Sequence, residues 1–287
     1  MLCMHLNPAP ETTNEKMHKA KAVLEVVVVF GSILLLIALV GLSPAGSWER
    51  QVSNRFFIEY GIMIIFPLLL LVATRRNLAA YGLSFRNFSY HLDIAATALV
   101  PVALASAAFA FVDYREWHGS LILAALRIAV LFVTGWLLKR KPTAAGKGVL
   151  LSTFLPLLFI GLAMGTWLGN ALTAIVFYLF FVGFGEELLF RGYIQSRLNV
   201  AFGKPFKFMG VNYGWGIVIA STLFGLMHVL NIGSLVGGRW ELAWWWGLWT
   251  FFGGLVLGFV REKSGGIIAP AILHGLPQAI AYAVLGL

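Results

Sequence analysis

The sequence has few charged residues and almost no cysteine. Charged side chains make up 11% of its 287 residues, whereas soluble domains carry about 25%, so the chain leaves little room for a separate soluble domain. Its single cysteine, Cys3, cannot form an internal disulfide. The sequence also has no CxxC pair or Cys/His cluster of the kind that binds structural zinc. Folds held by disulfides or by zinc are therefore excluded.

What the sequence has in quantity is apolar side chains. Hydrophobic residues make up 60% of the chain and the mean hydropathy is +0.85, which predicts an integral membrane protein in a lipid bilayer. The net charge of +9 would suggest nucleic acid as the partner of a soluble protein. In a membrane protein, basic cytoplasmic loops explain the same charge. No nucleic-acid-binding motif is present, so we expect no nucleic-acid partner.

Windows of about 20 apolar residues, the length that crosses a bilayer, predict an all-α, polytopic bundle of nine transmembrane helices, or eight if the weak division at 165–172 is not real. A polar tail, residues 1–21, precedes a first span that is longer than the apolar core of a signal peptide and is predicted to be retained. We expect N-terminal helices over 22–168 and a C-terminal core over 169–287. The GxxxG pairs Gly161/Gly165 and Gly254/Gly258 predict close helix contacts. The predicted spans are 22–42, 56–74, 92–112, 119–138, 149–168, 171–190, 212–232, 242–260 and 265–285.

Loop charges set the predicted orientation. Lys and Arg are enriched in cytoplasmic loops, and nine spans place sixteen of them on one side and four on the other. We therefore expect the N-terminus inside and the C-terminus outside. As a separate expectation, the membrane is a prokaryotic cell membrane. The sixteen are Lys16, Lys19, Lys21, Arg75, Arg76, Arg86, Lys139, Arg140, Lys141, Lys147, Arg191, Arg197, Lys204, Lys207, Arg261 and Lys263; the four are Arg50, Arg55, Arg115 and Arg239.

Charged and imidazole side chains are rare inside the predicted spans. A charge at the bilayer centre costs about 2.5–3.5 kcal/mol on insertion scales, so those that persist are usually paired or functional. Glu25 and Arg127 belong to no cluster and are interpreted as structural. The others lie in the predicted C-terminal core; they are Glu186, Glu187, Arg191, His228 and His274.

The spacing of these residues predicts three polar helix faces. Glu187 and Arg191 are four residues apart and can pair on one face, which leaves Glu186, turned by about 100°, free for other work. A carboxylate and two imidazoles can together act as general acid and base toward a water that attacks an amide. The same spacing of four relates Phe224 to His228 and His274 to Gln278.

Each feature also has a plain structural explanation. The Glu187–Arg191 pair can anchor a helix at the membrane edge, a lone histidine can join two helices by a hydrogen bond, and Phe224 can simply pack in the core. The occurrence of all three spaced pairs in one chain favours a functional site over these separate explanations.

The three patterns, in this order, resemble the signature EExxxR, FxxxH and HxxxN of the CAAX protease and bacteriocin-processing family of intramembrane proteases. The resemblance covers about residues 175–285. It implies a membrane-embedded endopeptidase whose substrate is a peptide or a segment of a membrane protein. In this chain the motifs read Glu186-Glu187-Leu-Leu-Phe-Arg191, Phe224-Gly-Leu-Met-His228 and His274-Gly-Leu-Pro-Gln278.

The resemblance also implies a role for each motif residue. Glu186 and His228 would activate the water, while His274 and Gln278 would form the oxyanion site. The family has been labelled metalloprotease, and Glu186, His228 and His274 could ligate Zn²⁺, but a glutamate-activated water needs no metal and we expect no cofactor. Glu187, counted with the catalytic residues, would together with Arg191 hold the helix and tune the catalytic pair, and Phe224 would be a supporting residue.

Two features of the chain strain this interpretation. Gln278 stands where asparagine is usual, which moves the amide by one methylene. If the span 212–232 enters from the inside, His228 lies about 24 Å deep at 1.5 Å per residue, whereas Glu186 would lie near the inner edge. The two side chains can meet if the helix of Glu186 continues to about Asn199 and residues 204–215 lie partly outside the membrane. We expect a wet pocket in the inner half of the bilayer.

Two functions of other classes stay open. One is an immunity or scaffold protein of the same fold without proteolysis; the other is a proton-coupled transporter with the glutamates and histidines as a relay, although no related halves are visible. Other intramembrane proteases fit poorly, because HExxH is absent, neither Asp93 nor Asp113 lies in GxGD, and no serine lies in GxSG. The sequence indicates no oligomeric state.

Overall fold

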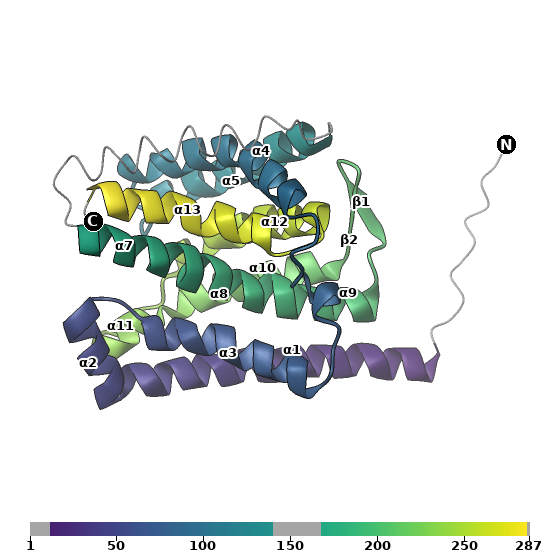
Figure 1. The fold of residues 1–287 in the computed structure, drawn as a ribbon, viewed down its shortest axis with the longest axis horizontal. Coiled ribbons are helices and arrows are strands. Elements are labelled where there is room, and N and C mark those ends of the chain that lie inside the picture. The colour runs from purple at the N-terminus through teal and green to yellow at the C-terminus, as the bar shows by residue number, and fades with distance from the viewer. Residues whose placement is uncertain (1–11, 140–167, 286–287) are drawn as a thin grey trace.

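The structure, a computed structural model, describes residues 12–139 and 168–285 (Figure 1). These residues form a bundle of helices with one short antiparallel hairpin, β1–β2, in which Lys207 faces Asn212. The predicted helix bundle is confirmed, and the hairpin corrects the all-α assignment. The first part contains α1 (Thr13–Leu42), α2 (Pro44–Ser53), α3 (Phe57–Ala73), η1 (Leu78–Tyr81), α4 (Phe88–Ala107), η2 (Ala108–Ala110) and α5 (Trp117–Lys139). The second contains α7 (Leu168–Ile175), η3 (Val176–Phe184), α8 (Gly185–Glu187), η4 (Leu188–Gln195), α9 (Ser196–Phe202), β1 (Phe206–Phe208), β2 (Val211–Tyr213), α10 (Trp215–Leu230), α11 (Ile232–Val236), α12 (Trp244–Ser264) and α13 (Ile268–Leu285).

Five described helices are long and apolar enough to cross a membrane, or six if α2 and α3, which meet at 119°, form one bent span. The predicted count of nine is therefore not confirmed. α12 and α13 are not among the five; α12 begins with three tryptophans and ends in Arg261-Glu262-Lys263, and both features lower its mean hydropathy. Residues 149–167 of a further predicted span lie outside the described part of the chain. The five are α1, α4, α5, residues 172–202 and residues 215–236.

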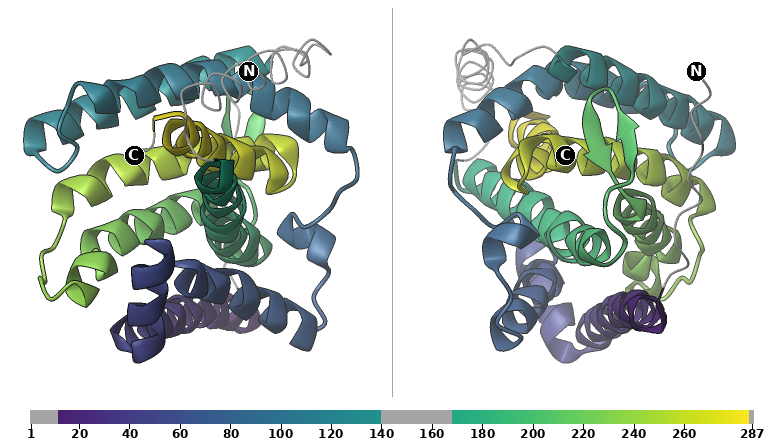
Figure 2. Two further views of the ribbon diagram at one scale, coloured as in Figure 1. Left: turned by 60° about the vertical axis from the view of Figure 1, so that its left-hand side comes forward. Right: turned by 90° about the vertical axis from the view of Figure 1, so that its right-hand side faces the viewer.

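The N-terminal helices lie on two sides of the C-terminal core. Figure 2 shows α1 to α3 on one side, α4 and α5 on the other, and the helices from α7 onward between them. The chain becomes helical earlier than predicted, because Thr12 caps α1 by accepting a hydrogen bond from the N–H of Glu15 (3.3 Å). Glu15 also pairs with Lys19 one turn later. Residues 13–21, predicted as a polar tail, therefore belong to α1.

One long helix, residues 168–202, runs through the core and carries Glu186; we call it the motif helix. It consists of α7, η3, α8, η4 and α9. The prediction that it continues past Arg191 is confirmed, since it ends at Phe202 and the hairpin follows. η3 and η4 are π-helical, and such wide turns are frequent at functional sites. Glu186 lies about 24 Å from the Phe202 end, close to the about 20 Å that separates His228 from the start of α10, so the depth mismatch disappears.

Glycines allow the core helices to approach closely. A Cβ on Gly275 would collide with the backbone of η3, and a Cβ on Gly183 would collide with the backbone of α13. Between α10 and α12, a Cβ on Gly254 would lie 2.9 Å from the Cβ of Ser221, which confirms the close contact predicted from its GxxxG spacing. The contact of η3 with α13 holds His274, next to Gly275, against the motif helix. The other predicted pair, Gly161 and Gly165, lies outside the described residues.

The two ends of the bundle differ in charge. α9 and the hairpin lie at the end where α1 begins, and α2 and α11 lie at the opposite end (Figure 1). Of the sixteen charges predicted at the first end, Arg140, Lys141 and Lys147 are outside the described residues and Arg191 is fully buried in the core. Counting Arg191 as a loop charge was therefore wrong, and twelve remain against four at the opposite end.

The two isolated charges are held by neighbours. Glu25 of α1 lies 2.8 Å from Arg197 and 2.5 Å from Arg76, which joins α1 to the motif helix and to the chain after α3. Arg127 lies over the rings of Phe109 and Trp249 at 5.9 Å. Both contacts agree with the structural interpretation of these charges.

Candidate active site

The predicted pair of Glu187 and Arg191 is present and fully buried. Nη1 of Arg191 donates to Oε1 of Glu187 at 2.6 Å, and neither side chain is exposed. The guanidinium also donates to the carbonyl of Gly254 in α12 at 3.1 Å and stacks over the ring of Phe224 in α10 at 4.6 Å. A buried charge is tolerated only when it is paired and hydrogen-bonded, and these contacts tie three helices together.

His274 of α13 lies between the two glutamates. Its Nδ1 is 3.0 Å from Oε1 of Glu187, so a hydrogen on Nδ1 is donated to that carboxylate. This bond directs Nε2 to Oε2 of Glu186, 3.6 Å away. Oε2 of Glu186 is buried and has no hydrogen-bond partner among the described protein atoms. The structure therefore presents a free carboxylate oxygen opposite an oriented imidazole.

Glu186 has one further contact that the sequence did not indicate. The hydroxyl of Tyr60 in α3 donates to Oε1 of Glu186 at 3.1 Å, and the carboxylate is only 3% exposed. Tyr60 is a single tyrosine in an apolar helix with no spacing pattern around it, so only the packing of α3 against the motif helix reveals it. The bond fixes the carboxylate and leaves Oε2 as its free oxygen.

His228, at the end of α10, presents its other nitrogen to the same site. Its Nδ1 lies 2.8 Å from the carbonyl oxygen of Phe224, so Nδ1–H donates there and Nε2 is left as an acceptor. The ring of Phe224 packs edge-to-face against both imidazoles, with centroids at 4.7 Å from His228 and 5.7 Å from His274. Trp246 of α12 packs against His228 at 5.1 Å. Phe224 is thus the aromatic contact shared by the two histidines.

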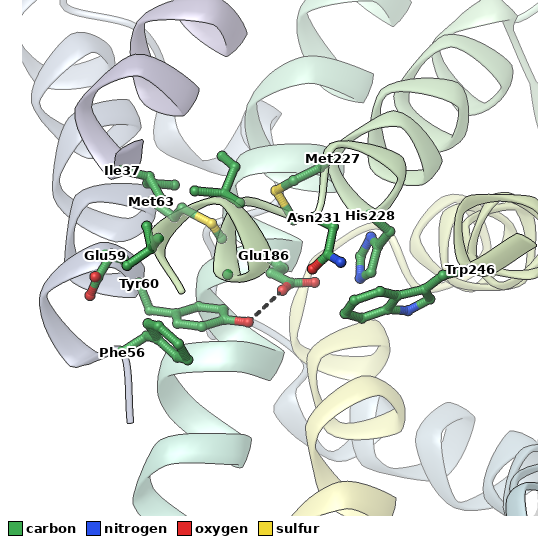
Figure 3. Close-up of a pocket in the computed structure, with 13 residues that line it drawn as sticks. Ile37, Phe56, Glu59, Tyr60, Met63, Glu186, Met227, His228, Asn231 and Trp246 are labelled. Atoms are coloured by element: carbon green, nitrogen blue, oxygen red, sulfur yellow. Dashed lines mark hydrogen bonds between the residues drawn. The ribbon is translucent and has the colours of Figure 1, made fainter. Parts of the chain in front are cut away.

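A cavity of about 210 Å³ lies beside Glu186 and His228 (Figure 3). Its remaining polar wall includes Tyr60 and Asn231; Glu59 also lines it, but its carboxylate points away from Glu186 in Figure 3 and lies 3.7 Å from Arg50. The rest of the wall is mostly apolar, so a water held at Glu186 is surrounded by nonpolar side chains. The apolar wall includes Ile37, Phe56, Met63, Met227, Val236 and Trp246.

The cavity lies toward the end of the bundle that carries α2 and α11 (Figure 1). Its lining includes the turn before α3, the end of α10 and Ile232, Gly233 and Val236 of α11, which lie toward the end of the bundle away from the start of α1. No residue of α11 is buried, so this wall is the accessible one. The motif helix extends well beyond Glu186 toward the start of α1, which puts the cavity nearer the opposite end of the bundle. The expected pocket in the inner half of the bilayer stays a prediction.

Of the seven predicted site residues, Glu186 and His228 line the cavity and the other five do not. Gln278 is half-buried in α13 and does not line it, and neither does His274, whose Nε2 lies 3.6 Å from Oε2 of Glu186. Within the described residues, no three His, Cys, Asp or Glu side chains are grouped so that they could hold a metal ion. Nδ1 of each histidine has an oxygen partner, so Nε2 is the ring nitrogen left for a ligand, and the alternative zinc set of Glu186, His228 and His274 stays a prediction.

Fold and site together define a polytopic membrane protein with a buried cluster of two glutamates and two histidines. Residues 167–280, which contain all three motifs, match the family model described as Type II CAAX prenyl endopeptidase Rce1-like. The resemblance inferred from the motifs is confirmed for this segment, and the family is one of proteases. Comparison with curated proteins and with solved structures gives no match.

Proposed function

We propose that this protein is an intramembrane endopeptidase in which Glu186 and His228 activate a water for attack on a peptide bond. The observation that carries the proposal is the free Oε2 of Glu186, which is buried at an apolar cavity beside two oriented imidazoles. A buried carboxylate inside a membrane protein costs free energy, and those that persist are usually functional. The matched family model supports the same class of reaction.

In the proposed reaction Oε2 of Glu186 accepts a proton from the water, and Nε2 of His228 accepts a hydrogen bond from its other O–H group. The water oxygen then bonds to the carbonyl carbon, and the carbonyl oxygen becomes an oxyanion. When the carbon–nitrogen bond breaks, Glu186 returns the proton to the leaving nitrogen. Nε2 of His274, when it carries a proton, donates toward these reacting atoms.

Glu187 and Arg191 are positioning residues in this proposal. Glu187 accepts from Nδ1 of His274 and so fixes the direction of Nε2, and Arg191 holds Glu187. Tyr60 fixes the orientation of Glu186 in the same way. The chemistry needs no metal, so we expect a chelator such as 1,10-phenanthroline to leave hydrolysis unchanged. Loss of hydrolysis with chelator and its return with Zn²⁺ would contradict the metal-free reaction.

The cavity also limits the substrate. Its mostly apolar wall suits an apolar side chain of a peptide or of a membrane-protein segment. The excess of basic residues at the other end of the bundle supports an N-terminus inside the cell. We therefore propose that the substrate approaches from the outer side of a cell membrane, past α11. Neither the site nor the family match favours the scaffold or the transporter alternative.

Glu186→Gln is the direct test, because it keeps the shape of the side chain and removes the base. The full-length protein in detergent is mixed with two internally quenched peptides, one with an apolar stretch and one farnesylated and ending in a CAAX sequence. We expect the wild type to cleave at least one of them and Glu186→Gln to cleave neither. Glu25→Gln is the matched control, since Glu25 is a membrane-helix glutamate in a contact far from the cavity. Cleavage by Glu186→Gln at the wild-type rate would overturn the proposal.

A further inference from the structure

We propose that Asn231, and not Gln278, provides the side-chain amide that stabilises the oxyanion. The inference rests on the proposed hydrolysis and adds a catalytic residue to it. Asn231 lies outside all three sequence motifs, at the residue where α10 ends and α11 begins. It lines the cavity together with Glu186 and His228.

The position of Asn231 follows from the end of α10. It caps α10 three residues after His228, and both side chains line the cavity. In Figure 3 the side chain of Asn231 lies between Glu186 and His228, with its amide oxygen toward the carboxylate and its amide nitrogen on the side of the imidazole. A peptide carbonyl next to the water held by Glu186 and His228 would therefore lie within reach of this amide.

The backbone fixes Asn231 in this orientation. Its φ of 43° and ψ of 55° are left-handed, a conformation that asparagine tolerates better than most residues. Its Nδ2 donates to Oγ of Ser234 at 2.7 Å. An amide nitrogen carries two hydrogens, so the bond to Ser234 holds the group still and leaves the second hydrogen for a ligand. A donor that is fixed before the reaction is the kind that stabilises an oxyanion most effectively.

Gln278 has no comparable position. It is one turn beyond His274 in α13, whereas the cavity wall consists of side chains from α1, α3, the motif helix, α10, α11 and α12. Its additional methylene gives the amide one more rotatable bond than an asparagine has. Gln278 of α13 therefore does not bring its amide to the cavity, and Asn231 provides the amide there.

The experiment compares kcat and KM of Asn231→Gly with those of the wild type on whichever quenched peptide the wild type cleaves. Glycine adopts the left-handed conformation freely, so this change removes the amide without straining the turn. Loss of one oxyanion donor lowers kcat by about 10²–10³-fold, and we expect a loss of that size with KM nearly unchanged. The carboxylate of Asn231→Asp cannot donate a hydrogen bond, so its kcat should fall as much as that of Asn231→Gly. The kcat of Ser234→Ala should fall less.

Asn87→Gly is the matched control, because Asn87 is also a left-handed asparagine (φ 57°) and lies at the opposite end of the bundle. It should keep the wild-type kcat. Gln278→Ala should lower kcat at least tenfold less than Asn231→Gly does. An unchanged kcat in Asn231→Gly, or a larger loss in Gln278→Ala, with Glu186→Gln inactive, overturns this inference alone. A wild type that cleaves neither peptide overturns the proposed hydrolysis and the role of Asn231 with it.

Discussion

The imidazole of His274 and the carboxylate of Glu187 share a contact of 3.0 Å between Nδ1 and Oε1. The same carboxylate oxygen accepts a hydrogen bond from Arg191 at 2.6 Å. One oxygen atom therefore connects the motif helix to α13 and balances a guanidinium that is fully buried. Because both contacts end on one atom, the stability of the core and the orientation of the histidine depend on the same group.

Glu187→Gln leaves Arg191 buried without its counter-charge. Removing one partner of a buried ion pair costs about 3–5 kcal/mol, so we expect the thermal unfolding temperature in detergent to fall in Glu187→Gln and in Arg191→Met. The unfolding temperature of the double variant should fall by less than the sum of the two single decreases, because the double variant leaves no uncompensated charge. Tryptophan fluorescence during heating measures all three.

Glu15→Gln is the control for this cycle. Its carboxylate pairs with Lys19 at the surface of α1 and is half-exposed, and such pairs contribute little. The unfolding temperature of this variant should stay close to that of the wild type. Fully additive losses in the Glu187/Arg191 cycle would show that the two side chains act independently, against the observed contact.

Tyr60→Phe tests the orientation of Glu186 without changing the shape of the cavity wall. A hydrogen bond to a charged group contributes about 1.5–3 kcal/mol, so we expect kcat for the quenched peptide to fall about tenfold or more with little change in KM. Tyr90→Phe removes a hydroxyl at the other end of the bundle and should leave kcat unchanged. Equal kcat in Tyr60→Phe and the wild type would mean that the hydroxyl has no part in the reaction.

The parts of the site that could be predicted are those fixed within one helix. Glu187 and Arg191 pair because residues four apart meet on any helical face, and the extension of the motif helix followed from the depth at which Glu186 must meet His228. The family resemblance also came from such local spacing. Helix geometry makes these relations independent of how the helices pack.

The parts that could not be predicted depend on which helices become neighbours. Tyr60 reaches Glu186 across 126 positions of sequence, and no pattern around Tyr60 marks it. Asn231 resembles an ordinary helix-ending residue until α11 folds back over the cavity. The π-helical turns of η3 and η4 also have no signal in the apolar run, yet they alter the register on both sides of Glu186. The predicted count of nine spans is not confirmed, because among the described helices α12 and α13 are not apolar or long enough to be counted as spans.

Gly275→Ala tests whether the close contact of α13 with η3 positions His274. A methyl group there would collide with the backbone of Tyr178 and Leu179, so α13 must move away from the motif helix. We expect a lower unfolding temperature and a lower kcat together, since the contact of His274 with Glu187 lengthens. Gly253→Ala is the matched control, because a Cβ at Gly253 meets nothing within 4 Å. Equal behaviour of the two variants would show that the helix spacing is not set by this glycine.

The side of the membrane to which the cavity opens can be tested without a substrate. In the proposed orientation α11 lies outside the cell and the hairpin inside. Gly233 of α11 is exposed, with open space around it, and Lys207 of β1 is exposed at the other end. In a Cys3→Ser background, which has no other cysteine, a membrane-impermeant maleimide should label Gly233→Cys in intact cells. It should label Lys207→Cys only after the cells are permeabilised.

Cells that carry the wild-type protein give an independent check, since its single cysteine, Cys3, belongs to the segment before α1 and should behave like Lys207→Cys. Labelling of all three positions only after permeabilisation would place α11 in contact with the lipid or the cytoplasm. The reverse pattern, with Lys207→Cys labelled in intact cells and Gly233→Cys protected, would invert the topology. The site would then act on substrates from the cytoplasmic side. The reason is that α11 is a fixed part of the bundle, so the side of the membrane that it faces follows the topology of the chain.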